Sequence, residues 1–95
     1  MTELASRKAY DVVVAEDELL IQENLIKKIN ALSLPFTIKG TFEEGESALD
    51  FIRNHHVDLL ITDIKMPVMS GLELSRILRA SFPSIKAVSY THLTL

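Results

Sequence analysis

The chain has 95 residues, of which 47% are hydrophobic and 24% are charged, with a formal net charge of -3. This size and balance predict one globular domain, and the small acidic excess gives no reason to expect direct nucleic-acid or membrane binding by this segment. The absence of cysteine excludes a disulfide framework, and no apolar run approaches the roughly 20 residues of a membrane span, so we expect a cytoplasmic location.

Strand and helix patterns alternate along the chain. Residues 1–9 are polar and unpatterned, which predicts a flexible leader. Strands are predicted at 10–15, 36–42, 57–63 and from 85, with 36–42 nearer the sheet edge; helices are predicted from 19 over about three turns, at 46–54 and at 71–80. The strict alternation predicts an α/β fold, a doubly wound parallel sheet with right-handed crossovers.

The first predicted helix is amphipathic. Its apolar residues recur at helical spacing, so we expect one buried face formed by Ile21, Leu25, Ile29 and Leu32. Gln22, with its polar and charged neighbours, is expected to lie elsewhere on the helix.

Two of the predicted strands end in acidic residues. Glu16 and Asp17 follow the first strand, and Asp63 ends the strand 57–63. If these strands are neighbours, the three carboxylates converge at one edge, where their repulsion favours a bound divalent cation. Oxygen ligands favour magnesium or calcium, and a shallow site that leaves several waters on the metal suits magnesium. A carboxylate beside such an ion can itself accept a phosphoryl group. The following turn is fixed by Pro67, and Ser70-x-x-Glu73 has the form of a capping box that starts a helix.

These residues carry a resemblance to a known family. Val-Val-Val-Ala-Glu-Asp-Glu, followed by Leu-Ile-Thr-Asp-Ile-Lys-Met-Pro-Val-Met-Ser-Gly-Leu-Glu-Leu, resembles the receiver domain of two-component response regulators. The resemblance covers Tyr10 to about Val88 and is closest to regulators whose receiver precedes an AraC-type DNA-binding domain. It implies a flavodoxin-like, CheY-like fold, of which the fifth strand and the fourth and fifth helices are missing.

The resemblance also implies roles for single residues. Asp63 would be the phosphoacceptor and Asp17 a magnesium ligand. Glu16 would act on the same ion directly or through a water molecule, and Lys65 would offer its backbone carbonyl. Thr91 falls at the position of the family's switch hydroxyl.

The end of the chain departs from the family pattern. The family's invariant lysine after the fifth strand has no counterpart, and Lys86 precedes a strand and cannot replace it. Without that lysine we expect this segment to be inactive in phosphotransfer. Residues 89–95 resemble a translated sequencing adaptor, so we expect the authentic sequence to stop near Ala87 or Val88, with residues 10–88 forming a partial receiver domain and 89–95 a non-native tail.

The function implied by the resemblance is signalling. A sensor histidine kinase would phosphorylate Asp63, and the change would switch an output domain outside this chain, expected to bind DNA and control transcription. Receivers of the family self-catalyse phosphotransfer and dephosphorylation but are not otherwise enzymes, and phosphorylated receivers can pair into homodimers. One alternative is an interaction module with the receiver fold that is never phosphorylated. A phosphatase of the haloacid-dehalogenase type is disfavoured because that class has a second aspartate two residues after its nucleophile, where this chain has Lys65.

Several of these residues also have simpler interpretations. Asp63 could cap a loop, and Glu16-Asp17 could cap the first helix. We expect His55-His56 to be a solvated turn rather than a metal pair or phosphodonor, because adjacent side chains at a helix end diverge. Met66 and Met69 are expected to be packing residues, and Glu43-Glu44 a solvated turn.

Overall fold

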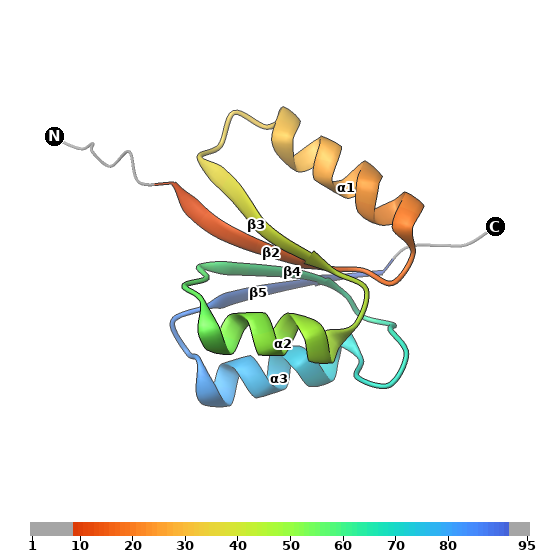
Figure 1. Cartoon of the computed structure of the whole chain (residues 1–95), viewed down its shortest axis with the longest axis vertical. Coiled ribbons are helices and arrows are strands. Elements are labelled where there is room, and N and C mark those ends of the chain that lie inside the picture. The colour runs from red at the N-terminus through yellow and green to blue at the C-terminus, as the bar shows by residue number, and fades with distance from the viewer. Residues whose placement is uncertain (1–8, 92–95) are drawn as a thin grey trace, which may run out of the picture.

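The computed structural model describes residues 9–91, which form an α/β domain (Figure 1). The strands β2 (Tyr10–Ala15), β3 (Phe36–Phe42), β4 (Leu59–Asp63) and β5 (Lys86–Tyr90) pair in parallel in the order β3-β2-β4-β5. The connecting helices are α1 (Leu19–Ala31), α2 (Gly45–Asn54) and α3 (Gly71–Ser81). This order is the flavodoxin-like winding, so the predicted doubly wound parallel sheet is confirmed. Residues 1–8 of the expected leader and 92–95 of the expected tail lie outside the described residues.

The helices cover opposite faces of the sheet. Helix α1 lies on one face, and α2 and α3 lie side by side on the other (Figure 1). Successive side chains of β2 point to opposite faces, so Val12 and Val14 pack with Ile29 of α1, while Val13 and Ala15 join the core beneath α2 and α3. The core between the sheet and helices α2 and α3 also contains Leu60, Ala48, Leu49, Ile52, Leu74 and Leu78. A central strand buried on both faces, as predicted for residues 10–15, therefore has a helix layer on each side.

The register between β2 and β4 decides which loops meet. Val12 pairs with Leu59, and Ala15 pairs with Thr62. At the carboxyl edge of the sheet, the residue after Ala15 therefore lies beside the residue after Thr62, which brings Glu16 to Asp63. At the amino edge, the same register places the residue before Val12 beside the residue before Leu59.

Strand boundaries differ from the prediction in β4 and β5, and β5 begins at Lys86, one residue later than predicted. Strand β4 begins at Leu59 rather than at Val57, although Val57 is buried in the core. Strand β5 continues past Val88 through Ser89 and Tyr90, because Tyr90 pairs with Asp63 and backbone pairing does not require an apolar side chain. That residues 89–95 are a non-native tail stays a prediction.

The orientation of α1 also corrects the sequence analysis. Ile29 is buried as expected, but Leu32 lies beyond the helix end and is half-exposed. Gln22 was expected on the polar side of the helix and is instead buried.

Within residues 9–91, no helix combines the length and apolar character needed to cross a bilayer, and α1 itself has 13 residues.

Candidate functional site

The three predicted acidic residues meet at the carboxyl edge of the sheet. Carboxylate oxygens of Glu16, Asp17 and Asp63 all lie within 4.8 Å of one another. Glu16 and Asp63 are 0% and 1% exposed, whereas Asp17 is half-buried and faces the rim. Their convergence, which the sequence predicted only on condition that the strands were neighbours, follows from the β2–β4 pairing.

The loop after Asp63 fixes the orientation of its carboxylate. The backbone N–H of Lys65 donates to Asp63 Oδ1 at 3.3 Å. The loop then turns back, so that the Gly71 N–H donates to the Ile64 carbonyl at 2.8 Å. Ser70 caps α3 by accepting a hydrogen bond from the Glu73 N–H at 3.1 Å, which confirms the predicted start of that helix. Asp63 is thus held between a rigid strand and a closed turn.

Gly71 occupies a position that no side chain fits. A Cβ atom there would lie 1.9 Å from the Asp63 carbonyl oxygen and 2.8 Å from its carbonyl carbon. Since these are backbone atoms, they cannot rotate away. The first residue of α3 is therefore a glycine because the helix starts in direct contact with the backbone of Asp63.

The Glu16 side chain is held by two hydrogen bonds. Its Oε2 accepts from the Glu18 N–H at 2.9 Å, and its Oε1 accepts from the Tyr90 hydroxyl at 2.5 Å. Burial raises the pKa of the Glu16 carboxyl, the hydrogen bonds from Tyr90 and Glu18 lower it, and Asp17 and Asp63 raise it further, so that the balance lies above the ordinary value. Burial, followed by the Glu16 carboxylate, also raises the pKa of Tyr90, whose hydroxyl therefore remains a donor.

Two residues of this site were missed by the sequence analysis. The buried Gln22 side chain donates from Nε2 to the Glu16 carbonyl at 3.2 Å and to the Phe42 carbonyl at 3.4 Å, linking α1 to the ends of β2 and β3. The spacing of Gln22 from Leu25 and Ile29 is that of a shared helix face and could have revealed it. Tyr90 was missed because it lies in the expected tail.

The cluster has the donor set of a magnesium site. Three carboxylates at an open sheet edge supply the oxygen ligands that this ion prefers. Beside them is an open hollow of about 510 Å³, lined by Asp17, Ile64, Lys65, Met66, Pro67 and Ser70. The residues present therefore fit a hydrated divalent cation; that the Lys65 backbone carbonyl binds it stays a prediction.

The other predicted residues are distributed as follows. Thr91 directly follows Tyr90, the partner of Asp63 in the sheet, and is exposed at the same edge. Lys86 opens β5 at the opposite edge, so it cannot reach Asp63, as predicted. Met66 lies in the core and Met69 packs against it, which confirms their packing role. The simpler role considered for Glu16 and Asp17 was to cap α1. The N-cap residue of α1 is Glu18, whose side chain makes no capping hydrogen bond, and the Glu16 carboxylate accepts the Glu18 N–H.

Comparison with known proteins identifies the family. The family model for the response regulator receiver domain matches residues 12–94. The chain belongs to this family. The receiver domain is 28% identical over 93% of its length to the transcriptional regulatory protein DegU of Brevibacillus brevis, and 33% identical over 83% to the uncharacterized transcriptional regulatory protein YesN of Bacillus subtilis. It spans only 37% and 22% of those two proteins.

Solved structures show the same fold. The non-phosphorylated receiver domain of the stress response regulator RcsB from Escherichia coli superposes with a TM-score of 0.77 at 22% identity, covering 88% of this chain and 66% of that one. At this identity the likeness concerns the fold alone. It agrees with the four-stranded parallel sheet and the two helix layers described above.

Proposed function

We propose that this receiver domain, as part of the full-length regulator, accepts a phosphoryl group on Asp63. The observation that carries the proposal is the position of Asp63, buried at the carboxyl end of β4 with oxygens of Glu16 and Asp17 within 4.8 Å. A carboxylate placed there has its orientation set by the Lys65 N–H and its surroundings set by two further acids. Such a group is a nucleophile for phosphoryl transfer once the negative charge around it is balanced.

The transfer from a phosphohistidine is balanced as follows. A carboxylate oxygen of Asp63 attacks phosphorus, a phosphorus–oxygen bond forms, and the phosphorus–nitrogen bond breaks with its electron pair leaving on the imidazole. Asp17 and Glu16 would hold a magnesium ion together with Asp63, and the Lys65 carbonyl would complete the protein ligands. When bound, this ion supplies the positive charge that offsets the developing charge on the phosphoryl oxygens.

The partners proposed for the domain follow from its family. A sensor histidine kinase would be the phosphodonor, in the cytoplasm where response regulators generally act. The relatives DegU and YesN are named as transcriptional regulators and are longer than this chain, which supports an output domain that binds DNA and responds to the phosphorylation of Asp63. Thr91, exposed at the same sheet edge, is the proposed switch hydroxyl.

Intact-mass analysis of the full-length regulator tests the phosphoacceptor. Treatment with a small acyl phosphate and Mg²⁺ should add one base-labile phosphoryl group to the wild type and none to Asp63→Asn, which keeps the shape of the side chain. Asp50→Asn, an exposed aspartate on α2, is the matched control and should be phosphorylated like the wild type. Unchanged phosphorylation of Asp63→Asn would show that the acceptor lies elsewhere, and no phosphorylation of the wild type would favour the non-phosphorylated interaction module.

Magnesium binding is tested separately. Asp17→Ala removes a carboxylate from the cluster and should weaken Mg²⁺ binding at least tenfold in titration calorimetry. Glu44→Ala removes an exposed carboxylate at the start of α2, outside the cluster, and should leave the binding unchanged. Equal losses in the two variants would mean that the ion binds by general charge attraction instead of at this site.

A further inference from the structure

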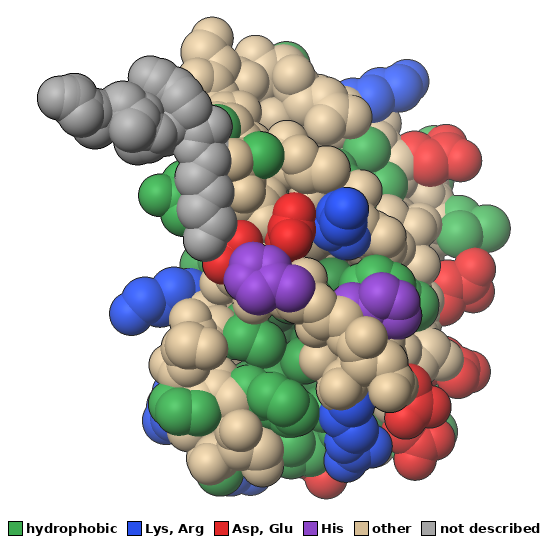
Figure 2. Space-filling view, turned by 60° about the vertical axis from the view of Figure 1, so that its left-hand side comes forward, with side chains coloured by type: hydrophobic (Ala, Val, Ile, Leu, Met, Phe, Trp, Pro, Cys, Tyr) green, Lys and Arg blue, Asp and Glu red, His purple; other side chains and the backbone are tan. Residues whose placement is uncertain are grey.

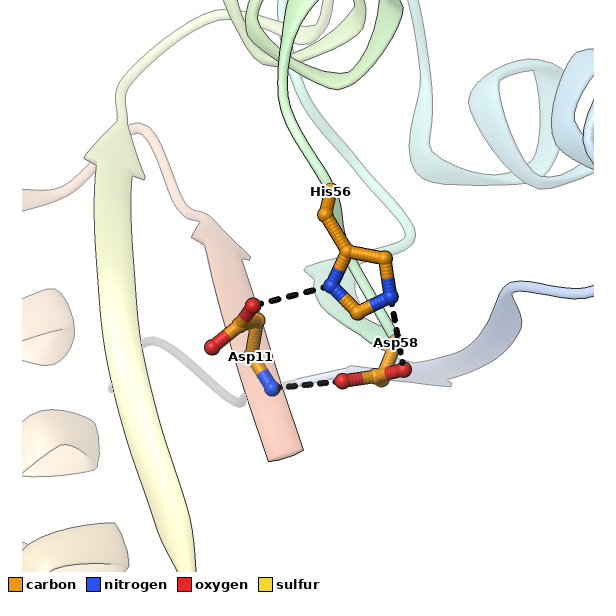
Figure 3. Close-up of polar contacts among 3 residues, drawn as sticks. All are labelled: Asp11, His56 and Asp58. Carbon is orange, nitrogen blue, oxygen red and sulfur yellow. Dashed lines mark hydrogen bonds and ion pairs between the residues drawn. The ribbon is translucent and has the colours of Figure 1, made fainter. Parts of the chain in front are cut away.

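A second polar cluster lies at the amino edge of the sheet, opposite the phosphoacceptor. It consists of Asp11 on β2, His56 in the segment between α2 and β4, and Asp58 just before β4 (Figure 3). On this surface the space-filling view shows histidine next to acidic side chains (Figure 2). His55 and His56 lie in an exposed turn, as predicted, but the sequence analysis missed that the His56 ring, which is 63% exposed, also contacts two carboxylates.

The two sides of the His56 ring make different contacts. Nδ1 lies 2.9 Å from Asp11 Oδ2, which is the length of a hydrogen bond. Nε2 lies 3.4 Å from Asp58 Oδ1, which is longer than the usual hydrogen bond. Two ligands of one tetrahedral zinc ion, each about 2.0–2.2 Å from the metal, are roughly 3.3–3.6 Å apart. The second contact thus has the separation of two metal ligands.

Hydrogen bonds to the backbone hold the Asp58 carboxylate in place and tie Asp58 to Asp11. The Asp11 N–H donates to Asp58 Oδ2 at 2.8 Å, and the Asp58 N–H donates to the Asp11 carbonyl at 2.8 Å. Because Asp58 Oδ2 accepts the Asp11 N–H, Asp58 presents Oδ1 to the histidine. The Lys86 N–H at the start of β5 donates to the Asp58 carbonyl at 3.0 Å, so Asp58 is hydrogen-bonded to both neighbouring strands.

We propose that His56 and Asp58 form a surface site for a divalent cation of the zinc class, with Asp11 as the positioning residue. Nε2 of His56 and Oδ1 of Asp58 are the ligands. Asp11 accepts the Nδ1 proton, which fixes the ring orientation and leaves the Nε2 lone pair for the metal, the arrangement usual for metal-bound histidines. A mixed nitrogen and oxygen donor pair selects Zn²⁺ over Mg²⁺, whose ligands are oxygen atoms.

A pair of neighbouring carboxylates would not support this proposal by itself, since exposed acids often lie close together without an ion. One further feature supports it. The His56 imidazole, which Asp11 orients, supplies a nitrogen ligand beside the Asp58 carboxylate. The His56 side chain is 63% exposed, so water can reach this position and complete the coordination of a two-ligand ion.

Titration calorimetry with Zn²⁺ on the full 95-residue chain tests the site, in excess Mg²⁺ to occupy the acidic cluster around Asp63. His56→Ala and Asp58→Asn should each weaken Zn²⁺ binding at least tenfold. Asp11→Asn retains an oxygen that can accept the ring proton and should lose less than either. The other two histidines provide matched controls: His55→Ala and His92→Ala should bind Zn²⁺ like the wild type.

Nitrogen NMR of the His56 ring distinguishes metal binding from a structural role. Zn²⁺ should shift the Nε2 resonance and leave Nδ1 protonated, while His56→Gln, which has an amide in place of the ring, should remain folded by circular dichroism and not bind. The proposal is overturned if Zn²⁺ does not bind at millimolar concentration, if binding survives in His56→Gln, or if the metal shifts Nδ1 instead of Nε2. Loss of binding in His55→Ala equal to that in His56→Ala would also overturn it.

Discussion

Replacing Gly71 by alanine should separate helix α3 from Asp63 at the end of β4. The added Cβ would lie 1.9 Å from the Asp63 carbonyl oxygen, whereas ordinary contacts begin at 3.4 Å, so the helix start must retreat by about 1.5 Å, the difference between these distances. Such overpacking costs about 1–3 kcal/mol, and breaking the hydrogen bond from Gly71 to Ile64 costs about 1 kcal/mol more. The higher helix propensity of alanine returns at most about 1 kcal/mol. We expect a net loss of roughly 1–3 kcal/mol in the free energy of unfolding.

Gly45→Ala is the matched control, because Gly45 is also the first residue of a helix and gains the same propensity. Its added Cβ would lie 3.1 Å from Met69, which requires adjustments of only a few tenths of an ångström. Urea unfolding should therefore show a near-neutral Gly45→Ala and a destabilised Gly71→Ala, with thermal midpoints that differ by about 10 °C. A neutral or stabilised Gly71→Ala, or equal effects in both variants, would refute the close approach of α3 to Asp63.

Three further changes test the surroundings of the site. Val68 has a φ of 67° and is 98% exposed, so Val68→Asn should raise the free energy of unfolding by about 1 kcal/mol and Val68→Ile should not. Tyr90→Phe removes the hydrogen bond to Glu16 and should lower that free energy by about 1.5–3 kcal/mol, with a much smaller loss in a Glu16→Gln background. Gln22→Ala removes the amide donor of the buried Glu16 carbonyl, whereas the Phe42 carbonyl keeps the Glu16 N–H, and should cost about 1–3 kcal/mol, against almost nothing for the exposed Glu23→Ala. Urea unfolding measures all three; a stabilising Tyr90→Phe or a neutral Gln22→Ala would contradict the contacts described.

The sequence predicted those features that depend on nearby residues. Helix and strand periods identified the order of elements, because each period is visible within a few consecutive residues. The apolar run ending in an acid likewise placed Asp63 at the carboxyl end of a strand, where the structure has it. The capping role of Ser70 toward Glu73 was predictable for the same reason. The boundary of β5 was not, because its last residues, Ser89 and Tyr90, are held by backbone pairing with β4, which leaves no trace in hydropathy.

Contacts between distant segments were missed for a related reason. Gln22 is buried by the end of β3, and His56 engages Asp11 across 45 positions of the chain. Neither partner is visible in a local pattern, so a polar residue on a helix and a histidine in a turn were both assigned to solvent. Gln22 could still have been found from its helical spacing, whereas His56 required the strand order and the register.

One feature of the sheet, the register between β2 and β4, assembles both the cluster at the amino edge and the cluster at the carboxyl edge. Pairing of Val12 with Leu59 and of Ala15 with Thr62 places Asp11 beside Asp58 at one edge and Glu16 beside Asp63 at the other. A slip of one residue would turn the side chains of β4 to the opposite faces and separate both sets of carboxylates at once. The amino-edge contacts therefore report on the register that also assembles the phosphoacceptor site. An Asp11 amide shift that is unchanged by Asp58→Asn would contradict this register, and with it the convergence of Glu16 and Asp63.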